Sequence, residues 1–322
     1  MSVFANTSAA SVAPADLPLK KLVDIALPGK ATRLDYQTLD TRKQLLFIAH
    51  LGEGNVVVVN TAMRRVVATI ADLRAVHGVL AVARRNTLYA SATGTDEVVA
   101  IDESSLKIKT RIPGGIYPDG MAYDPDNGRL FVSDEHGDTD TVIDTTTNRR
   151  IATIRLGGEA GNTQYDAVSH HMFVNVQTLG QLLEINPQTN RVLRKIALPG
   201  CEGNHSLLID PVHRRAFIAC EDNATFVWLD MREMRIVQEW RIGTDPDVLA
   251  LDPVTHRLYA AAESGVVTVF DDDSVRRLAQ GYLAPRAHTV AVDPRTHLVY
   301  FPLEDVDGAP FLRVMEQPAP GR

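Results

Sequence analysis

The chain has 322 residues, of which 45% are apolar and 23% charged, a composition typical of globular proteins and unlike that of disordered or fibrous chains. Its 40 acidic residues outnumber its 33 basic ones and give a formal charge of −7, which argues against nucleic-acid binding because that affinity depends mainly on clustered Lys and Arg. The sequence has no run of about 18 apolar residues, so it predicts no membrane-spanning helix.

The N-terminal residues 1–16 are small and polar. They lack the basic start and the apolar stretch of about 7–15 residues that a secretory signal needs, so no signal peptide is visible in them. We expect a flexible tail over residues 1–16 and a single domain over residues 17–322. Two cysteines neither require nor exclude an oxidising compartment, and the localisation stays open.

The rest of the chain repeats one phrase seven times. The copies are plainest as LDPVTHRLYAAAESG and VDPRTHLVYFPLEDV, and each has one large aromatic residue after the turn. The intervals between these residues are 42, 42, 42, 44, 42 and 41; in chain order the residues are Phe47, Tyr89, Phe131, Phe173, Phe217, Tyr259 and Tyr300. A period of about 40–45 residues with short β-rich segments indicates the four-stranded blades of a β-propeller.

Each copy contains the same succession of strands and turns. In the four plain copies an apolar strand leads into a DP-x-x turn and a second apolar strand leaves it, which is a hairpin pattern because Pro presets φ and Asp bonds the following backbone; three more degenerate copies follow the same frame. A third strand such as GVVTVFD and a fourth such as RVLRKIAL complete the sheet. The sequence therefore predicts an all-β, seven-bladed β-propeller.

The two ends of the chain complement each other. The last copy stops after its third strand, APFLRVMEQ, while the N-terminal LVDIALPG resembles RKIALPG, the fourth strand of the fourth copy. We expect the segment from Leu22 to Leu27 to pair with the third strand of the last blade. This pairing would close the ring and remove two exposed sheet edges.

The phrases GTDPDVLALDPVTHRLYAAAESG and YPDGMAYDPDNGRLFVSDEHG resemble the YVTN or YncE-like family of β-propellers over nearly the whole chain. The resemblance implies a seven-bladed propeller, often a bacterial protein exported to the periplasm or secreted. It also implies a group with ligand-binding, nucleic-acid-binding and cofactor-carrying members. It offers no catalytic motif for transfer to this chain.

One position of the repeat is expected to line the mouth of the central channel. It lies five residues before the turn aspartate, where the innermost strand begins, and in blade order it is Asp35, His77, Asp119, Gly161, His205, Asp247 and His288. The loops between second and third strands open on the same face; their equivalent residues are Leu51, Thr93, Glu135, Gln177, Glu221, Glu263 and Glu304.

Three of the channel positions suggest a metal site. His77, His205 and His288 come from blades two, five and seven, and three converging imidazoles suit Zn, Cu, Fe or Ni and leave coordination positions open. The interleaved Asp35, Asp119 and Asp247 are the candidate catalytic residues. They could act as bases or orient the imidazoles. Two alternatives stay open: a polar small-molecule or peptide site without a metal, and polar residues that only line a water-filled channel.

Other side chains on this face are candidates for substrate contact. Arg33 and Arg286 each lie two residues before a channel position in neighbouring blades, so they could form an anion clamp. Tyr117 has the same place in blade three and is expected to wall the pocket. The remaining candidates lie in the loops: His50, Glu135, His136, Glu221, Glu263 and Glu304.

The remaining histidines are expected on the opposite face, without a functional role, because they fall in or beside the turn between first and second strands. They are His170, His171, His213, His256 and His297.

Both cysteines belong near the functional face. Cys201 precedes the first strand of blade five and Cys220 ends the second. A disulfide and two buried free thiols are both compatible with this placement, because geometry decides bridging.

We therefore expect a monomeric propeller without a membrane span that binds a small molecule. One version of this expectation is a metal-dependent enzyme. The competing expectation is a non-catalytic scaffold that presents the same face to a peptide, protein or nucleic-acid partner. The sequence has no C-x-x-C-H, G-x-S-x-G, Walker A or G-x-G-x-x-G motif, which argues against covalent haem, serine-hydrolase and nucleotide-fold chemistry.

Overall fold

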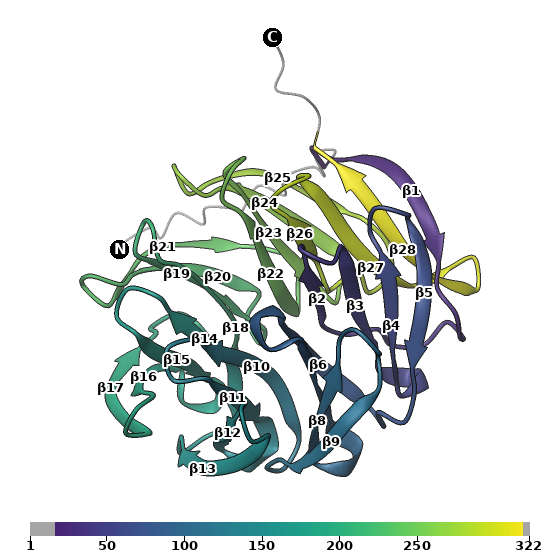
Figure 1. Cartoon of the computed structure of the whole chain (residues 1–322). Helices are drawn as coiled ribbons and strands as arrows, with labels where there is room; N and C mark the ends of the chain where they lie inside the picture. The colour runs from purple at the N-terminus through teal and green to yellow at the C-terminus, as the bar shows by residue number, and fades with distance from the viewer. Residues whose placement is uncertain (1–16, 318–322) are drawn as a thin grey trace, which may run out of the picture.

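Seven four-stranded antiparallel sheets follow one another around a common axis (Figure 1), so the predicted seven-bladed propeller is confirmed. The computed structural model describes residues 17–317, and the flexible tail predicted for residues 1–16 lies outside them. Within residues 17–317 the helical segments are short 3-10 turns, none of which has the length and apolar character to cross a membrane.

The strand bounds follow the repeat. The first three blades are β2 (Gln37–Asp40), β3 (Leu45–His50), β4 (Asn55–Asn60), β5 (Arg65–Ile70); β6 (Val76–Val82), β7 (Thr87–Ala92), β8 (Glu97–Asp102), β9 (Ile108–Pro113); β10 (Pro118–Asp124), β11 (Arg129–Asp134), β12 (Thr139–Asp144), β13 (Arg149–Arg155). Blades four to six are β14 (Ala160–Asp166), β15 (His171–Val176), β16 (Gln181–Asn186), β17 (Arg191–Ala197); β18 (Asn204–Asp210), β19 (Arg215–Cys220), β20 (Thr225–Asp230), β21 (Arg235–Arg241); β22 (Pro246–Asp252), β23 (Arg257–Ala262), β24 (Val266–Asp271), β25 (Arg276–Tyr282). Blade seven is β26 (Ala291–Asp293), β27 (Leu298–Val306), β28 (Ala309–Glu316) and β1 (Lys20–Ala26). The 3-10 turns are η1 (Leu51–Glu53), η2 (Ala83–Arg85), η3 (Thr93–Thr95), η4 (Glu135–Gly137) and η5 (Gln177–Leu179).

Burial along each blade follows from its two covered faces. The second and third strands, such as β3 and β4, are buried on nearly every residue, because neighbouring blades cover both faces of the sheet. The fourth strand, such as β5, alternates exposed and covered residues because it lies at the outer rim. The first strands of neighbouring blades contact one another, so the ends of these strands surround the channel.

The apolar cores lie between the blades. The seven aromatic residues that define the repeat are at most 2% exposed. Phe47 of blade one packs in one cluster with Leu88 and Val99 of blade two, and the stacked rings of Phe226 and Phe270 join blades five and six. The aromatic residues that define the repeat therefore lie in the apolar contacts between neighbouring blades.

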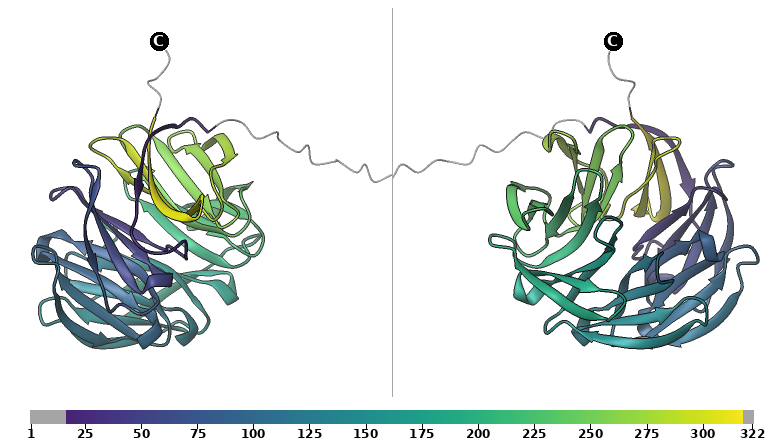
Figure 2. Two further views of the ribbon diagram at one scale, coloured as in Figure 1. Left: turned by 90° about the vertical axis from the view of Figure 1, so that its right-hand side faces the viewer. Right: turned by 60° about the vertical axis from the view of Figure 1, so that its left-hand side comes forward.

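The N-terminal strand closes the ring as predicted. β1 pairs antiparallel with β28, the third strand of the last blade, and Figures 1 and 2 show the purple strand beside the yellow one. Arg313 donates two hydrogen bonds of 2.8 Å to the Asp24 carboxylate across this pair. Backbone pairing and this ion pair thus join both ends of the chain in one blade.

Candidate functional site at the channel mouth

A cavity of about 700 Å³ opens at the end of the channel where the first strands begin; we call it the mouth cavity. Five of the seven predicted channel positions line it, whereas Gly161 and His288 lie outside its lining. The residues that line it are Arg33, Asp35, Tyr36, Leu51, Ala75, His77, Thr93, Gly94, Tyr117, Asp119, Glu135, His205, Glu221, Asp245, Asp247 and Glu263. The repeat therefore located this cavity correctly.

The chain enters several first strands through a left-handed residue that is not glycine. The equivalent residues are Ala75, Tyr117, Asp245 and Arg286, with φ of 47°, 60°, 50° and 51°. This conformation costs about 1–2 kcal/mol for an ordinary residue, and turn residues on the opposite face such as His170 and His256 adopt it too. The residue two positions later lines the mouth cavity in three of these blades, as His77, Asp119 and Asp247, whereas His288 lies outside the lining.

Tyr36 closes the bottom of the mouth cavity and is a site residue that the sequence reasoning missed. It lines both the mouth cavity and a smaller channel cavity of about 180 Å³. Its hydroxyl donates a hydrogen bond of 3.0 Å to Asn162 Oδ1 and lies 2.9 Å from His205 Nε2. The sequence does contain a sign of this arrangement. The equivalent residues of the next two blades are Gly78 and Gly120, and the absence of side chains there leaves space for the large side chain of Tyr36.

His205 is held from below by Tyr36 and faces carboxylates on its other sides. It is 7% exposed, with Nε2 3.6 Å from Asp247 Oδ1 and Nδ1 3.9 Å from Glu221 Oε1. Burial alone would lower the pKa of His205, but Glu221, Asp247 and Asp119 outweigh it and raise that pKa to about 9. Nδ1 has no hydrogen-bond partner among the described residues.

His288 is buried behind Asp247. Its Nδ1 donates to Asp247 Oδ2 at 2.6 Å and its Nε2 donates to the backbone oxygen of Leu34 at 3.0 Å. Burial alone would lower the pKa of His288, but the hydrogen bonds to Asp247 and Glu304 raise it well above its usual value. Because both ring nitrogens carry protons in this arrangement, the imidazole has no free lone pair for a metal ion.

His77 belongs to a row of rings on the opposite wall. Its Nδ1 donates to the backbone oxygen of Ala75 at 2.9 Å, and its Nε2 accepts from the Tyr117 hydroxyl at 3.0 Å. The Tyr117 ring lies between His77 and His136, with centroid distances of 5.0 and 4.1 Å. Tyr117 thus walls the cavity as expected.

The three histidines of the predicted metal triad therefore face different partners. Four groups of side chains within residues 17–317 bring ligand atoms within 4.8 Å of one another; none contains His77, and none contains both His205 and His288. The triad stays a prediction that this geometry does not favour. The group that does line the mouth cavity consists of His205, Glu221 and Asp247.

The two predicted clamp arginines converge on a carboxylate of the protein itself. Arg33 Nη1 donates to Glu263 Oε1 at 2.5 Å, and Arg286 Nε lies 3.7 Å from Glu263 Oε2. Arg33 also contacts Asp35 Oδ2 at 3.3 Å, and Arg286 Nη1 lies 3.6 Å from Glu304 Oε2. Both guanidinium groups thus neutralise the rim of the cavity between blades six, seven and one.

The carboxylates on the other side of the cavity lack such partners. Asp119 is 4% exposed and its Oδ1 accepts no hydrogen bond within the described part of the chain. Burial, Asp35 and Glu135 raise the pKa of Asp119 well above its usual value. Burial also raises the pKa of Glu221, to about 7, although His205 opposes this shift.

Four of the predicted substrate residues lie outside the cavity lining: Arg286, His50, His136 and Glu304. His50 is fully buried, with Nε2 3.0 Å from Thr32 Oγ1. Glu304 is 5% exposed, with Oε1 3.5 Å from His288 Nε2. Substrate contact by any of the four stays a prediction.

A disulfide joins Cys201 to Cys220, which decides the alternative that the sequence left open. Cys201 lies four residues before His205, and Cys220 immediately precedes Glu221. The bridge therefore ties together the two segments of blade five that carry these side chains.

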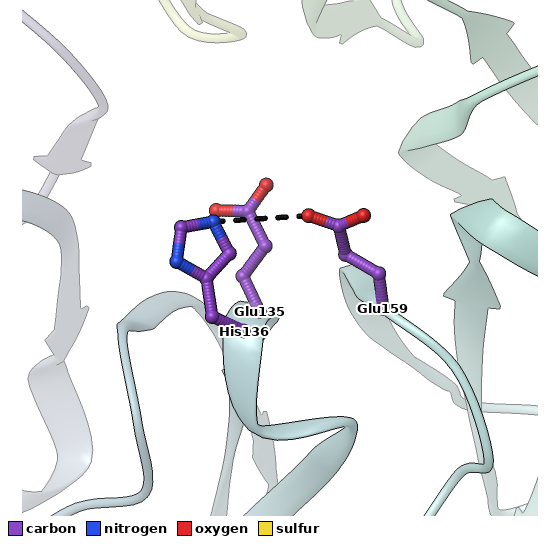
Figure 3. A group of neighbouring side chains, drawn as sticks. All are labelled: Glu135, His136 and Glu159. Atoms are coloured by element: carbon purple, nitrogen blue, oxygen red, sulfur yellow. Dashed lines mark ion pairs between the residues drawn. The ribbon is translucent and has the colours of Figure 1, made fainter.

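A second His and carboxylate group, made of Glu135, His136 and Glu159, lies at the rim of the mouth cavity (Figure 3), which Glu135 lines. His136 Nε2 is 3.7 Å from Glu159 Oε1, with side-chain exposures of 54% and 34%. The Glu135 carboxylate lies beside them, and all three side chains point to the same side. This rim group shares the donor types of the buried group but not its burial.

The histidines expected on the opposite face lie in or directly after the turns between first and second strands, at what we call the turn face. Each pairs through Nδ1 with a carboxylate: His170 with Asp126, His171 with Glu184, His213 with Asp210, His256 with Asp272 and His297 with Asp252. The donor to acceptor distances are 2.6–2.9 Å.

Comparison with known proteins establishes the fold alone. No family model matches the chain, and no curated protein matches it. A solved structure of Kuenenia stuttgartiensis hydrazine synthase is similar, with a TM-score of 0.73 at 14% sequence identity, covering 92% of this chain and 96% of that one. The propeller is thus shared with a known protein, while the YVTN or YncE-like resemblance stays an expectation.

Proposed function

We propose that this protein binds a small polar molecule in the mouth cavity. The observation that carries the proposal is the set of buried polar atoms there that have no hydrogen-bond partner within residues 17–317: Asp119 Oδ1, His205 Nδ1, Asp247 Oδ1 and Glu263 Oε2. Leaving such atoms unsatisfied costs about 1–3 kcal/mol each. A ligand that donates hydrogen bonds or carries positive charge recovers part of this free energy.

The size and walls of the cavity support the same proposal. A volume of about 700 Å³ lies within the range of known small-molecule sites. Tyr36 forms its floor and Tyr117 a wall, so a ligand has rigid flat surfaces to contact beside the carboxylates.

The proposal extends to catalysis if the bound molecule is a substrate and the protein is a metal-dependent enzyme. Asp35 is engaged by Arg33, and Asp247 by His288, which suits them to hold other groups in place. Asp119 has no such partner in the described structure, and burial with Asp35 and Glu135 nearby raises its pKa, which favours the protonated carboxyl that can donate a proton. Of the three predicted catalytic aspartates, Asp119 is therefore the one that we propose acts on a ligand.

The test is ligand-dependent stabilisation of the purified chain. We would screen small amines, polyols and carboxylic acids by thermal shift and confirm binding by calorimetry; a ligand at 100 times its Kd stabilises the fold by about 2.7 kcal/mol. Binding should be lost in Asp119→Asn and Tyr117→Ala, and kept in His170→Asn on the turn face.

The competing function is a scaffold that presents this face to a macromolecule. Absence of any small-molecule effect, together with capture of a peptide or protein that depends on rim residues such as His136, would favour it and overturn the proposal.

A further inference from the structure

We propose that the mouth cavity holds one divalent first-row transition metal ion, bound by His205, Glu221 and Asp247. This inference rests on the proposed function, because it names the positively charged group through which the cavity would bind its ligand. It replaces the predicted triad of histidines with one imidazole and two carboxylates.

The first support is the placement of the three side chains. One ligand atom from each lies within 4.8 Å of the other two, and all three residues line the mouth cavity. Bonds of about 2.0–2.2 Å to Zn²⁺ place ligand atoms roughly 3–3.5 Å apart, so closure requires side-chain shifts of about an ångström. The two blades that supply these residues, five and six, are adjacent in the ring.

The second support is the unsatisfied state of the buried atoms. His205 is 7% and Asp247 5% exposed, and His205 Nδ1 and Asp247 Oδ1 have no hydrogen-bond partner in the described chain. The nearby guanidinium of Arg33 is taken up by Asp35 and Glu263. A metal ion that displaces the proton of His205 binds the freed imidazole lone pair and a carboxylate oxygen together.

The third support is the set of contacts that fixes the ligands from outside. His288 donates to the other oxygen of Asp247 at 2.6 Å, and the Tyr36 hydroxyl lies 2.9 Å from His205 Nε2. The disulfide holds the strand end before Glu221. Groups that orient metal ligands in this way are typical of metal sites, and their removal costs about 10–100-fold in affinity.

The donor set predicts the class of metal. One nitrogen and two oxygens, with room for water or a ligand in an open cavity, suit Zn²⁺, Fe²⁺ or Ni²⁺ better than Ca²⁺, which prefers six to eight oxygens. Waters on such an ion would also donate hydrogen bonds to the unpaired oxygens of Asp119 and Glu263.

The experiment measures metal binding to the full chain without any organic ligand. After dialysis against a chelator, titration with ZnCl₂ by calorimetry, and mass spectrometry of the dialysed complex, should give one ion per chain. Glu221→Gln and His205→Gln should weaken Zn²⁺ by on the order of 100-fold or more, beyond the effect of an outer contact. The matched control is Glu159→Gln in the exposed rim group of Figure 3, which should leave the affinity unchanged.

A spectroscopic readout separates this site from the histidine triad. Cu²⁺ bound in place of Zn²⁺ should show coupling to a single nitrogen in its electron paramagnetic resonance spectrum, which disappears in His205→Gln. Coupling to three nitrogens, or loss of binding in His77→Gln, would overturn the assignment. Circular dichroism checks that each variant folds, and Asp247→Asn replaces any variant that does not.

The failure of this inference can be told from failure of the proposed function. If no metal binds to the wild-type chain, or if Glu159→Gln rather than Glu221→Gln removes it, the metal site is wrong. The small-molecule screen in the presence of chelator still decides whether the cavity binds an organic ligand.

Discussion

The two ends of the propeller use the same residue types, histidine and carboxylate, in opposite ways. At the turn face each histidine has a carboxylate partner of its own, and several pairs cross from blade to blade, such as His297 with Asp252 and Arg214 with Asp166. At the mouth the side chains come from many blades, two of the histidines, His205 and His288, are almost fully buried, and polar atoms are left unpaired within the described residues. Hydrogen-bonded pairs stabilise a fold, whereas buried polar atoms without a partner lower its stability and are available to bind a ligand.

The largest effect should come from breaking a buried pair at the turn face. Arg214 Nη1 donates to both oxygens of Asp166, at 2.6 and 2.7 Å, and Asp166 is fully buried. Arg214→Met should lower the free energy of unfolding by about 3 kcal/mol, because it leaves a buried charge without its cation. Urea denaturation measures this, and a change below about 1 kcal/mol would contradict the role assigned to the turn face.

Opening the disulfide should cost a similar amount at the mouth. The bridge closes a loop across a sequence separation of 19 residues, for which chain entropy gives about 3 kcal/mol. Cys201→Ala with Cys220→Ala should lose this stability and also weaken binding in the mouth cavity, because His205 and Glu221 lie close to the bridge. Equal ligand affinity in both forms, measured by calorimetry, would show that the bridge does not position the site.

Removing an unpaired carboxyl at the mouth should have the opposite sign. Asp119→Asn should leave stability at pH 7 unchanged or raise it by about 1 kcal/mol, because it removes a carboxyl whose ionised form is disfavoured by burial, Asp35 and Glu135. The same variant should lose ligand binding. A loss of stability above about 1 kcal/mol in urea denaturation would mean that Asp119 has a structural partner.

The pH dependence of the same variants sharpens the comparison. Although burial raises the pKa of Asp166, Arg214 and nearby hydroxyl and amide groups lower it overall, so its stabilisation is complete above the unfolded pKa and is lost as pH falls. Because the pKa of Asp119 is raised in the folded state, its contribution has the reverse sign and stability falls as pH rises above about 4. Urea denaturation between about pH 3 and pH 8 measures both effects. Compared with the wild-type chain, the free energy of unfolding of Asp119→Asn should fall less as pH rises, and that of Arg214→Met should fall less as pH drops.

The smallest effect should come from an exposed pair at the turn face. His170 and Asp126 have side-chain exposures of 63% and 50%, so solvent screens their interaction. His170→Asn should change stability by less than about 0.5 kcal/mol and leave ligand and metal binding unaltered, which also makes it the control for the mouth variants. A larger change would show that exposed and buried pairs do not differ as argued.

The amino-acid sequence was enough to predict the propeller, its seven blades, the strand that closes the ring and the face that carries the cavity. These features repeat along the chain, because each blade needs the same aromatic core residue, and six of the seven blades have the same turn aspartate, with Val82 at that position in blade two. The seven equivalent positions therefore mark the channel mouth from the repeat alone, and Asp35, His77, Asp119, His205 and Asp247 do line the cavity.

Which of these side chains meet depends on the three-dimensional arrangement of the blades. Equivalent positions in seven blades share a ring, but His77 bonds Tyr117 and His288 bonds Asp247, each in a neighbouring blade, rather than one another. Tyr36 fills the centre because two following blades have glycine there, and the cysteines pair because their Cα atoms lie 5.3 Å apart. Partner choice depends on side-chain reach across blades, which a periodic pattern within one blade does not contain.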